Sequence, residues 1–308
     1  MSLQQAEERI RDLEKQISAT EDKKRREQLQ QEKKRLLTEA YGNIGSYDRV
    51  YLARKNTRPC VRDYIGRIFT DFVELHGDRL MRDDPAIIGG IASLDGMSVT
   101  VIGHCKGKTL EENLKFNFGM PNPEGYRKAL RLMKQAEKFR RPIVTFIDTP
   151  GAYPGLESEM HGQGEAIARN LIEMGSLAVP IIAIVIGEGG SGGALALSVA
   201  DRIWMLENAV YSILSPEGFA SILWKDASRA KEAAELMKLT AYDLYERGIA
   251  DRLFGEPAGG VDSNARSIYL RLKNALSDEL TALVRQNPRT LVEQRHRKFR
   301  RIGDCSSK

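Results

Sequence analysis

The sequence predicts an α/β fold in which a buried sheet is covered by helices on both faces. Two runs, residues 143–147 and 181–186, are almost wholly apolar, which is typical of strands that carry helices on both sides. Each run leads into a glycine-containing segment and then into a helical pattern, as in a strand–turn–helix unit. The 308 residues, 42% of them hydrophobic, suffice for one sizeable core, so we expect one main domain.

The composition excludes several classes of protein. The net charge of +5, from 47 basic and 42 acidic residues, permits but does not argue for an anionic partner such as CoA or nucleic acid. Cys60, Cys105 and Cys305 are scattered, which predicts neither a zinc site nor a disulfide framework and favours a reducing compartment. The first residues are too charged for a signal peptide, and no apolar run approaches the roughly 18 residues of a membrane span. We expect a soluble, cytoplasmic protein with no membrane contact and no metal.

The first third of the chain predicts an arm and the start of the sheet. Apolar residues recur at helical spacing over residues 1–40, with a charged break at 21–27, so we expect a helix–turn–helix arm. The stretch from Arg58 predicts a helix that runs through residues 69–75 and ends near residues 76–79. Residues 87–94 and 98–104, joined by Asp95-Gly96, predict an antiparallel hairpin.

The rest of the chain alternates predicted helices and strands. Residues 124–139 predict a helix with an apolar face and a basic face, and residues 295–301 form a basic run that we interpret as solvated. Ser215 and Pro216 predict a capped helix start, and Asn287-Pro288 predicts a break in a long C-terminal helix. Further elements are expected as a helix from about 162, strands at 202–206 and 210–214, and helices at 229–239 and 241–247. The predicted division is a helical arm at 1–57, a core at 58–258 and a helical basic extension at 259–308.

A glycine-rich segment predicts an anion site. Residues 187–193 hold five glycines within seven residues, between an apolar strand and small helix-forming residues. Glycine has no Cβ, so bare backbone N–H groups can approach a ligand there, and at a helix start they favour negative charge. The same order recurs at residues 149–155, with Gly151 placed 41 residues before Gly192. We expect two sets of amides in one cleft, although a turn that needs glycine only for packing would show the same pattern.

Four segments carry a resemblance to a known family. Residues 117–133, 148–155, 187–194 and 215–225 together resemble the alpha subunit of the carboxyltransferase of bacterial or plastid multi-subunit acetyl-CoA carboxylase. The resemblance covers about residues 40–258. It implies the crotonase-like (ClpP/crotonase) ββα superhelix, with helical N- and C-terminal extensions. It also implies transfer of a carboxyl group to acetyl-CoA, which gives malonyl-CoA for fatty acid synthesis.

The resemblance further implies partners and site residues. The partners are a carboxyltransferase beta subunit in an α2β2 assembly, a biotin carboxyl carrier protein that brings carboxybiotin, and biotin carboxylase in the larger complex. No cofactor would be bound covalently by this chain. In the family the amides at the Gly192 and Gly193 positions form the oxyanion hole for the ureido oxygen of biotin, and the beta subunit holds the acetyl-CoA enolate. The positions expected to contact substrate are Gly151, Ala152, Gly189 and Gly190.

Two alternative enzymes remain open at this stage. Gly189-x-Ser191-x-Gly193 fits the nucleophile elbow of serine hydrolases, in which the catalytic histidine follows the serine. Only His296 follows Ser191, and it lies inside the basic run, which argues against hydrolysis. The other histidines all precede Ser191: His76, His104 and His161. A crotonase-fold acyl-CoA decarboxylase is the second alternative.

A non-catalytic role is the third reading. A binding protein would need the glycines only for packing, and its basic arm or tail would be the part that meets a partner such as RNA. His104 and Cys105 do not suggest a catalytic pair, because adjacent residues of a strand point to opposite faces. We interpret the charge runs of the arm and the tail as solvated faces, so nucleic acid is not an expected partner.

Overall fold

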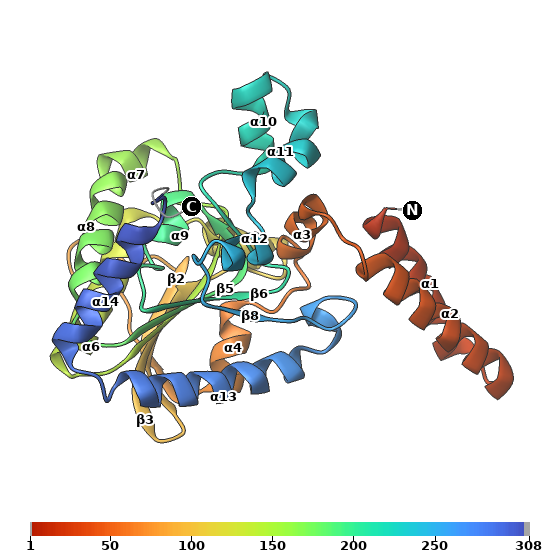
Figure 1. Cartoon of the computed structure of the whole chain (residues 1–308), viewed down its shortest axis with the longest axis horizontal. Coiled ribbons are helices and arrows are strands. Elements are labelled where there is room, and N and C mark those ends of the chain that lie inside the picture. The colour runs from red at the N-terminus through yellow and green to blue at the C-terminus, as the bar shows by residue number, and fades with distance from the viewer. Residues whose placement is uncertain (1, 305–308) are drawn as a thin grey trace.

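The computed structural model describes residues 2–304, which form one eight-stranded sheet flanked by helices (Figure 1). The strand order is β1-β2-β3-β4-β5-β6-β8, and β7 pairs with the end of β5. β1, β2 and β3 are antiparallel neighbours, whereas β3 through β8 run parallel. The strands are β1 (Thr70–Glu74), β2 (Ile87–Leu94), β3 (Met97–His104), β4 (Ile143–Thr149), β5 (Ile181–Gly190), β6 (Arg202–Leu206), β7 (Val210–Ser212) and β8 (Arg252–Phe254).

The helices follow the predicted order and add three short ones, α3, α5 and α7. Their bounds are α1 (Leu3–Ala19), α2 (Lys23–Tyr41), α3 (Ser46–Ala53), α4 (Val61–Ile68), α5 (Leu110–Lys115), α6 (Pro123–Lys138), α7 (Leu156–Met160), α8 (Gln163–Ser176), α9 (Ser191–Leu195), α10 (Pro216–Trp224), α11 (Ala230–Met237), α12 (Ala241–Glu246), α13 (Ala265–Leu283) and α14 (Pro288–Arg301). The expected cap at Ser215 is confirmed, since Ser215 accepts a hydrogen bond from the Gly218 N–H, and the expected break at Asn287 is confirmed by the start of α14 there, where Asn287 accepts a hydrogen bond from the Arg289 N–H.

Helices cover both faces of the sheet, as predicted. A Cβ on Gly89 of β2 would lie 2.4 Å from the Leu132 side chain of α6, and one on Gly103 of β3 would lie 2.6 Å from Val61 of α4. Gly103 is paired with Ile88, the residue before Gly89. Paired residues point to the same face and adjacent residues to opposite faces, so Gly89 and Gly103 point to opposite faces. α6 and α4 therefore enclose the sheet between them.

The hairpin is confirmed and one helix is corrected. Asp95 and Gly96, with φ of 48° and 86°, form the two-residue turn between β2 and β3. The predicted helix from Arg58 is wrong beyond Ile68, because residues 70–74 form the edge strand β1. These residues pair with β2 and are largely exposed on the sheet edge. Tertiary pairing, rather than local helix preference, decides their structure.

The basic face of α6 contacts a loop and is not free in solvent. Lys128 is buried, and its Nζ lies 2.6 Å from the Asp83 carboxylate and 2.7 Å from the Asp84 carbonyl. Arg127 pairs with Asp78 at 2.9 Å, and Arg131 donates to the Gly77 carbonyl. This face therefore holds the loop of residues 76–84 against α6.

The basic C-terminal run is also not a solvated tail. Arg295 of α14 is 1% exposed, and its guanidinium lies 2.8 and 2.9 Å from the two carboxylate oxygens of Asp201. It also donates to the carbonyls of Met174, Leu177 and Val179. The expectation is wrong for this residue because its partners come from chain segments that are remote in the sequence. α13 and α14 contribute buried side chains to the main core.

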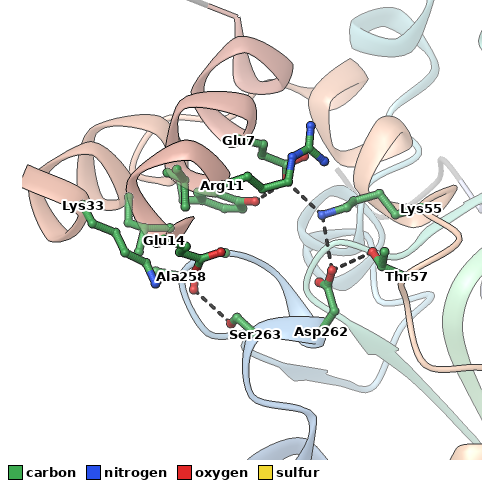
Figure 2. A pocket seen from close by; sticks show the side chains of 13 residues that line it. Glu7, Arg11, Glu14, Lys33, Lys55, Thr57, Ala258, Asp262 and Ser263 are labelled. Carbon is green, nitrogen blue, oxygen red and sulfur yellow. Dashed lines mark hydrogen bonds and ion pairs between the residues drawn. The ribbon is translucent and has the colours of Figure 1, made fainter. Parts of the chain in front are cut away.

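The α1–α2 hairpin projects from the core, whereas α3 packs on it (Figure 1). Its base is held at the buried Glu7 carboxylate, which accepts from the Tyr51 hydroxyl at 2.9 Å, from Lys55 Nζ at 3.0 Å and from the Tyr41 hydroxyl. Lys55 also pairs with Asp262 at 3.3 Å, beside a cavity of about 350 Å³ between the arm and the core (Figure 2). This cavity contains none of the predicted site residues.

The Arg295–Asp201 pair generates a stability prediction. Arg295→Met should lower the free energy of unfolding by about 3–5 kcal/mol, because it leaves a buried carboxylate without its cation. Arg297→Met, at an exposed position of the same helix, is the control and should change it by less than about 0.5 kcal/mol. Urea denaturation measures both, and equal effects of the two substitutions would contradict the assignment.

Candidate functional site

The two glycine-containing segments meet at the carboxyl ends of β4 and β5. A Cβ on Gly190 would lie 2.1 Å from the Pro150 carbonyl oxygen, and one on Gly193 would lie 2.5 Å from the Ala152 nitrogen. Real Cβ atoms do not approach other atoms this closely, so only glycine allows the two backbones to touch. Residues 149–155 and 187–193 therefore lie against each other, as expected, whereas their presenting two sets of amides to one cleft stays a prediction.

The local path differs from the predicted strand, turn and long helix. β5 continues through Gly190, and α9 begins at once with Ser191, whose φ is +54°. α9 ends at Leu195, so it is too short for the helix dipole that the sequence suggested. What remains are the first-turn amides of Ser191, Gly192 and Gly193, which have no hydrogen-bond acceptor within residues 2–304.

The glycines at this junction differ in the space around them. At Gly192 a Cβ would meet only the Ile167 side chain, at 3.6 Å, which is an ordinary contact, so packing does not require glycine there. Gly193, Gly189 and Gly190 are tightly enclosed, and the last two lie in β5 beside β7. Gly151 has a φ of 150°, which side chains rarely tolerate. Substrate contact by Gly151, Ala152, Gly189 and Gly190 stays a prediction.

A network of charges lies beneath the junction. Lys106 Nζ bridges the carboxylates of Asp148 and Glu188, at 2.8 Å from each. Arg54, directly after α3, binds Glu188 at 2.7 Å and Glu217 of α10 at 2.8 Å, and the Glu188 N–H donates to Asp148 at 3.0 Å. The ends of β4 and β5 are thereby joined to each other and to α3 and α10.

The network favours the ionised form of Glu188. Burial alone would raise the pKa of Glu188, but Lys106 and Arg54 outweigh it and hold that pKa below its usual range. Burial likewise opposes the charge on Lys106, and Asp148 and Glu188 raise its pKa. Because the folded pKa of Glu188 is depressed, its stabilising contribution is present at neutral pH and is lost as the pH falls below about 4.5.

Sequence reasoning missed this network. Asp148 and Glu188 each follow an apolar strand, and that position was a signal, since carboxyl ends of parallel strands share one edge of a sheet. Lys106, Arg54 and Glu217 come from three other segments and gave no signal.

His104 lies behind Gly193 and is fully buried. Burial lowers its pKa to about 3, although the neighbouring backbones of Gly193 and Phe146 act in the opposite direction. Neither ring nitrogen has a well-formed hydrogen bond within the described residues. His104 is therefore neutral at physiological pH and is closed off from a ligand at the surface.

Ser191 has the strained backbone of a nucleophile elbow but not its partners. It is exposed, and no histidine of residues 2–304 is hydrogen-bonded to it. His161 contacts Glu124, and His76 contacts Asp83. A nucleophilic serine requires an adjacent base, so this geometry does not support the hydrolase alternative.

Exposed apolar side chains lie on the segments that flank the junction. They are Leu110 and Leu114 of α5, Leu156 and Met160 of α7, and Ile213 after β7, each more than 60% exposed. α5 follows Lys106, α7 follows the 149–155 segment, and β7 pairs with Gly189 and Gly190. Large apolar side chains around a polar site mark a surface that another molecule covers.

The described part of the chain offers neither a metal centre nor a membrane-spanning helix. No group of three or more histidine, cysteine, aspartate or glutamate side chains in residues 2–304 is arranged to hold a metal ion. Within the same part of the chain, no helix has the length and apolar character needed to cross a bilayer. Cys305, one of the three cysteines, lies outside the described residues.

Comparison with known proteins gives consistent matches. A family model described as acetyl co-enzyme A carboxylase carboxyltransferase-like matches residues 1–303. The chain is 56% identical over 280 residues to the acetyl-coenzyme A carboxylase carboxyl transferase subunit alpha of Geobacillus thermodenitrificans (strain NG80-2), covering 91% of this chain and 86% of that protein. It is 57% identical over 265 residues to the beta/alpha subunits protein of Clostridium tetani (strain Massachusetts / E88), covering 86% of this chain and 46% of that protein.

A solved structure supports the fold. The crystal structure of transcarboxylase 12S, with methylmalonyl-coenzyme A and methylmalonic acid bound, matches with a TM-score of 0.59 and 21% identity. The match covers 74% of this chain and 43% of that chain. The expected crotonase-like carboxyltransferase fold is confirmed.

The burial of His104 generates a pH prediction. The unfolded chain takes up a proton at His104 near pH 6.5 and the folded chain only near pH 3, so acidification between these values favours unfolding. From pH 7 to pH 5 this costs about 2 kcal/mol. Urea denaturation at pH 7 and pH 5 measures the free energy of unfolding, and His104→Leu should remove this part of the difference between the two values. A variant with the same difference as the wild type would contradict the assignment.

Proposed function

The chain belongs to the family of acetyl-CoA carboxylase carboxyltransferase alpha subunits, and we propose that its glycine junction is the half-site that receives the carboxyl donor. The chain is a component of the transferase that moves a carboxyl group to acetyl-CoA. The proposal rests on the amides of Gly192 and Gly193, which have no acceptor within residues 2–304. Both residues are glycines, so neither carries a side chain beside its amide.

The residues present fit a carboxylated biotin. Carboxybiotin, brought by a biotin carboxyl carrier protein, would supply an activated carboxyl group and a ureido oxygen that gains negative charge as the group leaves. Gly192 and Gly193 each offer a backbone donor to such an oxygen, and backbone donors act without reorientation. The Gly151–Ala152 segment packs against Gly193 and fixes the direction of its amide.

Among residues 2–304, no side chain beside the junction is placed to take the methyl proton of acetyl-CoA. His104 is buried behind Gly193, and the carboxylates of Asp148 and Glu188 are held by Lys106. We therefore assign proton removal, and binding of the enolate, to groups that this chain does not supply. The chain's own task is to hold the donor and stabilise the charge that develops on it.

The missing half of the site fits a beta subunit. The Clostridium tetani relative is named as beta/alpha subunits in one protein, and the present chain matches less than half of it. The exposed apolar side chains of α5 and α7 flank the junction and would be covered by such a partner. An α2β2 assembly, a carrier protein and biotin carboxylase complete the proposed system. The scattered cysteines make the cytoplasm its proposed location.

Gly192→Val tests the amide donors. A β-branched side chain at this half-exposed position should crowd the amides of Gly192 and Gly193, and the loss of an oxyanion donor typically costs about 2.7–4 kcal/mol, or a hundredfold or more in kcat. The assay measures malonyl-CoA formation by the chain reconstituted with beta subunit and carboxylated carrier; the chain alone should give none.

The control is Gly164→Val, because Gly164 is exposed on α8 and a Cβ there meets nothing within 4 Å. It should keep wild-type turnover. Gly193→Val is a poorer test, since any side chain there meets the Ala152 backbone and disturbs folding. Wild-type turnover by a folded Gly192→Val complex would indicate that these glycines serve packing only and would contradict the proposal.

A further inference from the structure

The hydroxyl of Tyr126 is buried without a partner. Tyr126 lies in the first turn of α6 and is 0% exposed, and its Oη has no hydrogen-bond partner within residues 2–304. Buried polar groups in proteins are nearly always paired, because an unpaired one loses its bonds to water and gains nothing. A phenylalanine would fill the same space without that cost. The oxygen therefore calls for a reason other than packing.

The hydroxyl lies directly behind the glycine junction. Its oxygen is 2.8 Å from the position where a Cβ on Gly193 would stand, and that same position is 2.5 Å from the Ala152 nitrogen. The Tyr126 ring packs with Ala166 and Ala196. Tyr126 thus lies against the first turn of α9 and is shielded from solvent.

Hydrogen bonds fix the start of α6 to the segment of residues 149–155 and thereby fix the position of the Tyr126 hydroxyl. The Tyr153 N–H donates to the Pro121 carbonyl at 3.0 Å. Gln163 Nε2 donates to the carbonyls of both Pro121 and Tyr153, at 2.9 Å each. The Asn122 N–H donates to the Asp84 carboxylate at 2.7 Å. These bonds place Tyr126 at a defined distance from both halves of the junction.

We propose that Tyr126 is a positioning residue for carboxyl transfer, whose O–H dipole turns toward the first turn of α9 when negative charge develops on an oxygen bound by the amides of Gly192 and Gly193. This inference rests on the function proposed above. In a site shielded from water a dipole one layer behind the donors still lowers the energy of the charge. Burial raises the pKa of Tyr126 well above 10, so the hydroxyl keeps its proton and remains a donor.

Tyr126→Phe, with Tyr64→Phe as the matched control, tests the proposal in the reconstituted complex. Tyr64 is also 0% exposed with an unpaired hydroxyl, but it lies on α4, stacked on Phe146 at 5.5 Å. Removing an unpaired buried hydroxyl should leave the urea midpoint unchanged or raise it in both variants. Only Tyr126→Phe should lower kcat, by about tenfold, with an unchanged KM for acetyl-CoA.

The outcomes separate this inference from the function on which it rests. Wild-type kcat in Tyr126→Phe, or an equal loss in Tyr64→Phe, would overturn it. A lowered urea midpoint in Tyr126→Phe would also overturn it, since the hydroxyl would then have a structural partner. Gly192→Val is measured in the same assay. If Gly192→Val is inactive while Tyr126→Phe has wild-type kcat, only the proposed role of Tyr126 is contradicted. If Gly192→Val is active, the proposed donor role of the amides is contradicted as well.

Discussion

The close approach of two backbones is the constraint on which the site depends. Residues 150–152 touch residues 190–193 at distances that only glycine permits at positions 190 and 193. β4 and β5 are parallel neighbours, so their carboxyl ends lie at the same edge of the sheet. Because Gly190 and Gly193 have no side chain, the segments that follow the two strands can touch. A single Cβ at either glycine would push the two segments apart and turn the amides away from a common ligand.

The surroundings of this contact are less favourable than the rest of the core. Ser191 has a positive φ, and His104 and Tyr126 are buried with unpaired polar atoms against the same turn. Features of this kind cost stability and tend to gather where function requires them. The bridge from Lys106 to Asp148 and Glu188 offsets part of that cost by joining the strand ends. The main core and the Arg295–Asp201 pair supply the remaining rigidity.

Local signals predicted most of the fold, and non-local pairing explains the errors. The Asp95-Gly96 turn, the Ser215 cap and the break at Asn287 each depend on a few adjacent residues, and all were found. The sequence predicts helix at β1, which is wrong because the structure of this segment comes from its pairing with β2. The glycine junction was predictable, since the spacing of two strand ends implies that they meet. The charge network and the partner of Arg295 were not, because no local pattern links such distant segments.

The most direct test of the account is the hydrogen exchange of the Gly192 and Gly193 amides. In the isolated chain neither amide has an acceptor within the described residues; the amide of the partly buried Gly192 should therefore exchange rapidly, and that of the buried Gly193 more slowly. Saturating free biotin, added to the complex with the beta subunit, should slow exchange at both positions, as measured by mass spectrometry with fragmentation to single residues. Unchanged exchange at both amides while biotin is bound would contradict the claim that this junction holds the carboxyl donor.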